Sequence, residues 1–397
     1  MIRGNFKHYL KDVITNRVVQ AMLLLFMIHF IWLIGTENFQ HAKSVIGDMK
    51  YLVYPLLFLS FVDKRFFFRV LTAFVVGMLY SEVISYLIHF HILPHQLILN
   101  SIELYRASSN IDPSPFLDHS RYTVLLSFTI AILLYNILNN KNTILVTVVS
   151  SFFLITATIN LSLIGGRIGY ISFFVIISFL ILSRYRANLF KAILTLIIST
   201  FLIFSLFYNT SSLFQQRIDK SINTIKTISD SKSDSNLNSS FGLRLGFWIY
   251  STKIIKDNFL LGVGTGDQLD EVKKIIPDKH SYIKTQSHAH NEYIKTFLQF
   301  GLIGFIIFLN IFYQIFKYDT LDKYRKDILT LLSIIILIAI MTSILGSRTY
   351  LQLLTTIVSI SIAKKSLVAD SFKFMDKKTY LLYFGLASLS LIIAVLQ

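Results

Sequence analysis

Long apolar runs recur along the whole 397-residue chain, and they constrain its fold more strongly than any other feature. An apolar run of about 18 residues or more is long enough to cross a bilayer as a helix. The composition agrees, because 54% of the residues are hydrophobic and only 15% are charged, whereas soluble domains carry about 25% charged residues. We therefore predict an all-α fold, a polytopic transmembrane helical bundle of about 11–12 spans. The expected spans are 18–35, 48–62, 66–90, 122–138, 143–164, 168–183, 189–208, 291–316, 327–346, 349–364 and 379–396.

The distribution of Lys and Arg orients these spans. Short loops rich in Lys and Arg stay on the cytoplasmic side of a membrane. Every short basic loop falls on the same side of the predicted arrangement, so the segment 209–290 lies on the opposite side, outside the cytoplasmic membrane. The net charge of +16 is concentrated in the basic loops. Anionic membrane lipids are therefore the expected partners of this charge, and nucleic acid is not.

The spacing of the spans divides the chain into three parts. Residues 1–208 are expected to form an N-terminal transmembrane bundle of about seven spans, and residues 291–397 a C-terminal bundle of about four. Residues 209–290 form a large outer loop, in which apolar residues at helical spacing predict an amphipathic helix over Phe241–Leu260. A polar connector, 229–240, precedes that helix. The chain has no cysteine, which excludes disulfides and thiolate catalysis.

Two arginines stand near the expected membrane boundary. Arg167 follows two glycines at the outer end of two spans. A guanidinium in that position either snorkels to the interface or binds a phosphate group through two parallel hydrogen bonds. Arg244 precedes Trp248 in the expected amphipathic helix. That pairing is typical of an interfacial anchor, so the sequence by itself leaves the role of Arg244 open.

The stretch Ser287–Phe305 places titratable side chains at the mouth of a span. Asn291 is a suitable helix N-cap, so His290 is expected at the outer end of a helix, with Gly301 and Gly304 allowing close helix contact. Histidine exchanges a proton near neutral pH, which suits a general base or a phosphate contact. A plain interfacial role and a metal site are the alternatives. The metal site, whose ligand spacing matches no established zinc pattern, would use His280, His288, His290 and Glu292.

Taken together, these segments resemble the O-antigen ligase and polymerase family of bacterial membrane glycosyltransferases. His290-Asn291, followed by nine residues, Gly301, two residues and Gly304, matches the family's H[NSQ]-x9-G-x-x-[GTY] pattern at every specified position. Arg167 stands where the family places its first essential arginine, and Arg244, followed by Trp248, is similar to the second. The order of the motifs is also alike.

The resemblance implies the chemistry. It implies a metal-independent, cofactor-free, inverting transfer at the periplasmic face of the bacterial inner membrane. The donor would be a polysaccharide on undecaprenyl diphosphate, and the acceptor a sugar hydroxyl of lipid A–core. Arg167 and Arg244 would hold the diphosphate, and His290 would orient or deprotonate the acceptor hydroxyl. We expect the neighbouring His288 and Asn291 to contact the substrate.

Two other functions stay open at this point. A polymerase of the same family would use the same donor and extend another undecaprenyl-linked chain, although the context of His290 favours a ligase. A flippase for lipid-linked oligosaccharides would carry charges along a path inside the spans, whereas the charges singled out above gather at one face. His119 and Arg121 are candidates for an acceptor site, and the alternative for them is a polar cap on the next span.

Overall fold

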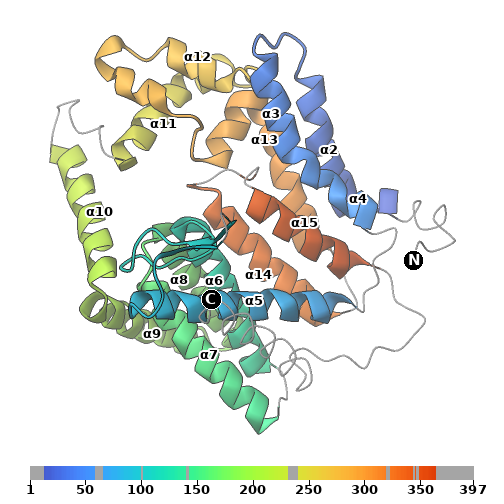
Figure 1. Cartoon of the computed structure of the whole chain (residues 1–397). Helices are drawn as coiled ribbons and strands as arrows, with labels where there is room; N and C mark the ends of the chain where they lie inside the picture. Colours follow the sequence, from blue (N-terminus) through green and yellow to red (C-terminus); the bar gives the residue numbers. More distant parts are fainter. Residues whose placement is uncertain are drawn as a thin grey trace. The chain divides into compact units, whose positions relative to one another are not determined.

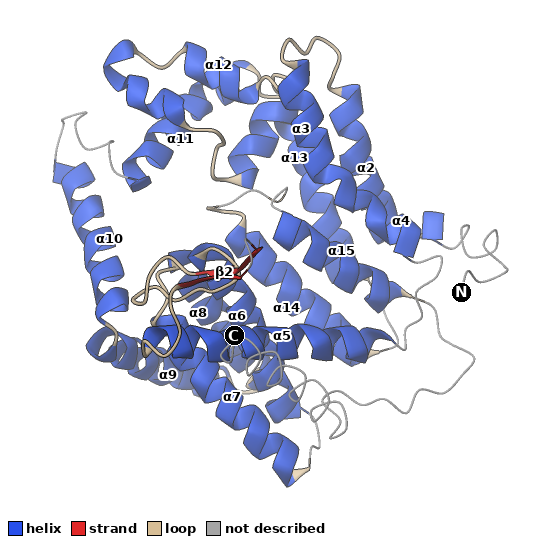
Figure 2. Ribbon diagram, in the orientation of Figure 1, coloured by secondary structure: helices blue, strands red, loops and turns tan. Residues whose placement is uncertain are grey.

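The computed structural model describes residues 13–58, 66–99, 102–139, 143–230, 240–318, 322–342, 345 and 348–363. Nearly all of them are helical, which confirms the predicted all-α helical bundle (Figures 1 and 2). The described residues fall into two compact units. The first takes those within Met1–Lys64 and Ile222–Ser366, and the second takes those within Arg65–Ser221. This division differs from the three consecutive parts expected from the spacing of the spans.

Six helices of the described residues are long and apolar enough to cross a membrane. Five belong to the second unit: α5 (Phe66–His89), α6 (His119–Asn139), α7 (Ile144–Ser162), α8 (Arg167–Arg184) and α9 (Leu189–Thr210). The sixth, α13 (Glu292–Lys317), belongs to the first unit. These six correspond to six of the eleven expected spans, and the total of about 11–12 spans stays a prediction.

The other expected spans are shorter or broken where the structure describes them. The span expected at 18–35 is the 15-residue α2 (Arg17–Ile31). The span expected at 48–62 is divided into η1 (Lys50–Val53) and α4 (Tyr54–Phe58), where Pro55 has no N–H to donate to a continuous helix. Those expected at 327–346 and 349–364 form α14 (Lys323–Ala339) and α15 (Arg348–Ile362). The span expected at 379–396 lies outside the described residues.

In the second unit, α6 is the central helix. Over its most apolar stretch 78% of the helix is buried, against 6% for α9, because α6 packs against both α7 and α8 while α9 contacts chiefly α8. The apolar side chains that α9 leaves exposed suit contact with lipid. A feature that the sequence analysis missed is an antiparallel hairpin of β1 (Gln96–Leu99) and β2 (Ile102–Arg106) between α5 and α6 (Figure 2).

In the first unit, α13 packs against α2 and is broken at Gly301. Gly301 has φ 60° and ψ −156°, a combination that is essentially restricted to glycine. The carbonyls of Leu298 and Gln299 at this break accept hydrogen bonds from the backbone of Val263 and Gly264, at 2.8 and 3.0 Å. On the other side of the break, Leu302 N donates to Phe259 O at 2.8 Å. A loop therefore supplies hydrogen-bond partners for the backbone groups at the break in the helix. A backbone away from water requires such partners.

Gly301 also lies directly against this loop, 259–264. A Cβ built on Gly301 would lie 2.4 Å from backbone atoms of Leu260. The glycine predicted to allow close helix contact therefore admits a loop instead. Gly304 lies against its own helix, because a Cβ on it would meet the Phe300 side chain at 2.0 Å.

The segment expected as an outer loop is largely helical where it is described. It contains α10 (Ser212–Asp230), α11 (Ser240–Asp257), α12 (Gln268–Lys274) and η3 (Asp278–Thr285). Helix α11 confirms a helix in the range expected, Phe241–Leu260, but it ends at Asp257 and its apolar residues are not gathered on one face as an amphipathic helix requires. Most of the expected connector 229–240 lies outside the described residues. In the first unit, α11, α12 and η3 share an apolar core with the start of α13, formed by Phe247, Tyr250, Ile254, Leu269, Val272, Ile276, Ile283, Ala289 and Leu298.

Candidate functional site

The residues selected from the sequence fall into two groups, one in each unit. The first unit holds Arg244, His280, His288, His290, Asn291, Glu292, Gly301 and Gly304. The second unit holds His119, Arg121 and Arg167.

In the first unit, the short loop 286–291 carries the two central histidines from η3 into α13. Asn291 caps α13 as predicted, since its side-chain oxygen accepts the N–H of Ile294 at 3.2 Å. The other side of the loop is held by Trp248 of α11, whose indole N–H donates to the carbonyl of Ala289 at 2.7 Å. The cap and the indole therefore fix the backbone on both sides of His290.

His290 has a left-handed backbone conformation, with φ 50°. A residue with a side chain is strained there by about 1–3 kcal/mol, and such strain gathers at functional sites. The turn brings the rings of His288 and His290 together, with centroids 3.6 Å apart and planes inclined by 48°. The two imidazoles therefore form one compact pair rather than two separate interfacial side chains.

The backbone N–H of His290 donates to Nδ1 of His288 at 3.2 Å. Because a backbone N–H can only donate, Nδ1 of His288 accepts, and in the neutral ring its proton resides on Nε2. Protonation of His288 at Nδ1 would break this hydrogen bond. The geometry therefore favours a neutral His288 with one defined tautomer.

Burial, and after it the adjacent His288 and Arg244, together lower the pKa of His290 to about 3. The pKa of His288 is also lowered, first by burial and then by Arg244 and Lys295. Desolvation and neighbouring positive charge both disfavour the imidazolium form. At neutral pH both rings are therefore uncharged, and His290 presents a neutral imidazole that can accept a proton.

Arg244 lies on α11, one turn before Trp248, so the two side chains share a face of the helix. The guanidinium is half-buried, and burial lowers its pKa. Its charge acts on both histidines. A half-buried guanidinium beside neutral imidazoles carries donors of the kind that suit a phosphate group.

A buried ion pair lies just inside α13. Lys295 Nζ is 3.4 Å from Glu292 Oε1, and both side chains are less than a tenth exposed. The other carboxylate oxygen of Glu292 accepts the N–H of Leu345 at 2.7 Å, and the Glu292 N–H donates to Ile340 O at 2.9 Å. This pair anchors the first turn of α13 in the first unit, and sequence reasoning did not select Lys295.

The metal alternative gains no support from the geometry. Glu292 is occupied by Lys295 and Leu345, and His280 Nδ1 lies 2.7 Å from the hydroxyl of Tyr250. Within the described ranges, no three His, Cys, Asp or Glu residues converge to hold an ion. Glu292 and His280 therefore each have partners of their own, apart from the His288–His290 pair.

In the second unit, Arg167 is the first residue of α8 and is half-buried. His119 is the first residue of α6, and its Nδ1 lies 3.4 Å from the buried carboxylate of Asp112. Arg121 pairs with Asp118 at 2.8 Å, and both side chains are exposed. Asp118 Oδ1 also accepts the N–H groups of Ser120 and Arg121, each at 3.1 Å, so this run does cap α6. Substrate contacts by His119 and Arg121 stay predictions.

These observations define first a class of protein: a polytopic helical membrane protein that presents a pair of neutral histidines and an arginine where a helix begins. Residues 152–309 match the family model described as O-antigen ligase. The chain therefore carries an O-antigen ligase family segment, which includes Arg167, Arg244, His290 and both glycines of the pattern. No curated protein matches the chain. The family is one of membrane proteins that transfer glycans in the assembly of O-antigen and related polysaccharides.

Proposed function

We propose that this protein is an O-antigen ligase. It transfers O-polysaccharide from undecaprenyl diphosphate to a sugar hydroxyl of lipid A–core at the periplasmic face of the inner membrane. The observation that supports this most strongly is the pairing of a neutral His290 with Arg244, within the segment that matches the family. A proton acceptor beside an anion-binding guanidinium suits the displacement of a diphosphate by a hydroxyl.

The proposed step is a single displacement. The acceptor oxygen forms a bond to the anomeric carbon of the donor sugar while the bond from that carbon to the diphosphate oxygen breaks. The electron pair leaves with undecaprenyl diphosphate, and the hydroxyl proton passes to His290. One displacement inverts the anomeric configuration. Arg244 balances the charge that grows on the departing diphosphate.

The low pKa of His290 has a consequence for this step. An imidazole with a pKa of about 3 is a weak base in the free protein. A bound diphosphate places negative charge close to the ring, which favours the imidazolium and raises its pKa. Donor binding would thus make His290 a better base when it is needed.

Two further assignments rest on the resemblance. Arg167 is proposed to bind phosphate because it has the position of the family's first essential arginine. His288 is proposed to orient His290 and the acceptor hydroxyl. Asn291, which caps α13, is proposed to contact the substrate beside the two histidines. The reaction proposed here uses no metal and no cofactor.

A polymerase that extends undecaprenyl-linked chains is the second candidate, because the family segment is shared by both activities. A deletion strain distinguishes the two by the lipopolysaccharide pattern on a gel. Loss of all polysaccharide from core, with long undecaprenyl-linked chains accumulating, supports the ligase. Core that carries a single repeat identifies a polymerase and contradicts the proposal.

A further inference from the structure

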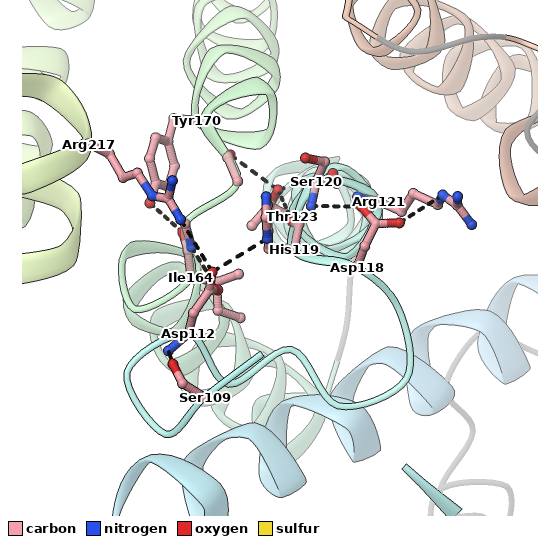
Figure 3. Close-up of polar contacts among 12 residues, drawn as sticks. Ser109, Asp112, Asp118, His119, Ser120, Arg121, Thr123, Ile164, Tyr170 and Arg217 are labelled. Carbon is pink, nitrogen blue, oxygen red and sulfur yellow. Dashed lines mark hydrogen bonds and ion pairs between the residues drawn. The ribbon is translucent and has the colours of Figure 1, made fainter. Parts of the chain in front are cut away.

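Asp112 is a buried carboxylate that joins three parts of the second unit (Figure 3). Its Oδ1 accepts the backbone N–H of Gly165 at 3.0 Å, in the turn between α7 and α8. Its Oδ2 lies 3.4 Å from His119 at the start of α6 and 3.5 Å from the guanidinium of Arg217 on α10. A buried carboxylate is costly unless it is paired and hydrogen-bonded, and Asp112 has both kinds of partner.

The turn that Asp112 contacts is the one that leads into Arg167. Its carbonyl groups are bonded by side chains from other elements. Ser211 donates to Ser162 O at 2.6 Å, Tyr170 donates to Ile164 O, and Thr123 donates to Gly166 O at 3.2 Å. The turn is therefore fixed residue by residue, and Asp112 supplies the bond to the N–H of Gly165.

Neighbouring side chains pack closely against both glycines of this turn. A Cβ on Gly165 would lie 2.6 Å from the Arg217 guanidinium and 2.9 Å from Asp112 Oδ2. A Cβ on Gly166 would lie 2.0 Å from the hydroxyl of Thr123. Because the two glycines have no side chains, the Asp112–Arg217 ion pair can approach the turn on one side and α6 on the other.

We propose that Asp112 is a positioning residue for Arg167. By holding the Gly165 N–H and the Arg217 guanidinium at once, it fixes the start of α8 and therefore the direction from which the Arg167 guanidinium meets the donor diphosphate. Arg217 neutralises the carboxylate, so that Asp112 does not repel the phosphate groups that Arg167 binds. This inference rests on the proposed function, which gives Arg167 its phosphate contact.

The test measures binding of undecaprenyl diphosphate to the purified full-length protein in nanodiscs, together with the melting temperature. Asp112→Asn removes the charge and keeps an oxygen that can accept the Gly165 N–H. We expect it to raise the Kd about tenfold or more, the scale of one charge-assisted hydrogen bond lost between Arg167 and a phosphate. Asp219→Asn is the matched control. Asp219 lies on α10, as Arg217 does, and accepts a hydrogen bond from the Tyr208 hydroxyl at 2.9 Å instead of contacting the turn.

A double substitution separates positioning from a general loss of stability. If Asp112 acts through the guanidinium of Arg167, Asp112→Asn should change the Kd by less than about twofold in an Arg167→Lys background. An equal loss in both backgrounds, or an unchanged Kd in the otherwise native protein, overturns the inference. If Asp112→Asn does not fold, Arg217→Gln is measured in the same two backgrounds, since it breaks the ion pair and leaves the Gly165 hydrogen bond in place.

The inference and the proposed function fail in different ways. If Arg167→Ala and His290→Ala both transfer polysaccharide normally, the proposed function is wrong, whatever Asp112 does. If both are inactive while Asp112→Asn and Arg217→Gln bind undecaprenyl diphosphate normally, only the positioning role is wrong.

Discussion

The backbone N–H of His290 donates to Nδ1 of His288, and the two imidazole rings lie 3.6 Å apart. This hydrogen bond thus fixes the tautomer of His288 and holds the His290 ring close to it. Two imidazoles at this distance do not both carry a proton readily, because like charges in a half-buried site disfavour ionisation. The proposed chemistry depends on this relationship.

Replacement of His288 by Asn should raise the pKa of His290. His288 is the second contribution, after burial, to the lowered value of about 3 for His290, so its removal relieves part of the shift. The acid limb of the pH profile of kcat/KM reports free-enzyme groups and should move to higher pH in this variant. An acid limb that does not move, or that moves to lower pH, would show that the pair is not electrostatically coupled.

Stability should fall as the pH is lowered through the window between about 6.5 and 3. The pKa of His290 is about 3 in the folded protein against an ordinary value of 6.5 for histidine. The unfolded chain therefore binds more protons in this window, and lowering the pH favours it. The melting temperature in detergent should decrease from pH 7 to pH 4, and it should decrease less in His290→Asn. An equal decrease in both proteins would contradict the low pKa of His290.

Gly301→Ala should destabilise the protein. The backbone at φ 60° and ψ −156° strains any residue with a Cβ, by about 1–3 kcal/mol, and the added carbon would lie 2.4 Å from Leu260. Gly47→Ala on α3 (Phe39–Met49) is the control, because no atom lies within 4 Å of a Cβ there, and alanine favours a helix by about 1 kcal/mol over glycine. The melting temperatures should therefore change in opposite directions.

Trp248→Phe should loosen the histidine loop. The substitution keeps most of the apolar side chain and removes the hydrogen bond to the carbonyl of Ala289, which contributes about 1 kcal/mol. We expect faster amide exchange across 288–290 and slower transfer. Unchanged exchange in this loop, measured by mass spectrometry, would show that the indole does not hold it.

Local sequence signals predicted the helical fold and two structural features of the candidate site. The cap at Asn291 and the helix that carries Arg244 depend on residues within a few positions of each other, so composition and spacing were sufficient. The histidine was selected by the family pattern, and its left-handed turn was not foreseen, because no local rule requires φ 50° at His290.

Local sequence signals could not predict contacts between residues that are far apart in the chain. Asp112 and Gly165 are 53 positions apart, and the loop at Leu260 that meets Gly301 comes from a segment about 40 positions earlier. The β1–β2 hairpin carried only a short signal, since exposed Leu104 and Arg106 alternate with buried Tyr105 and Ala107 at the end of its second strand. In a chain dominated by apolar runs, that short alternation was overlooked.

The most direct measurement is the rate at which purified His290→Asn transfers polysaccharide from undecaprenyl diphosphate to lipid A–core. Asn adopts the left-handed conformation readily, so the turn should persist while the proton acceptor is lost. His91→Asn is the matched control, because His91 also has a left-handed backbone, with φ 61°. We predict that His290→Asn transfers about 10²–10⁴-fold more slowly at an unchanged melting temperature, while His91→Asn transfers normally. Normal transfer by His290→Asn would contradict the central role of this histidine.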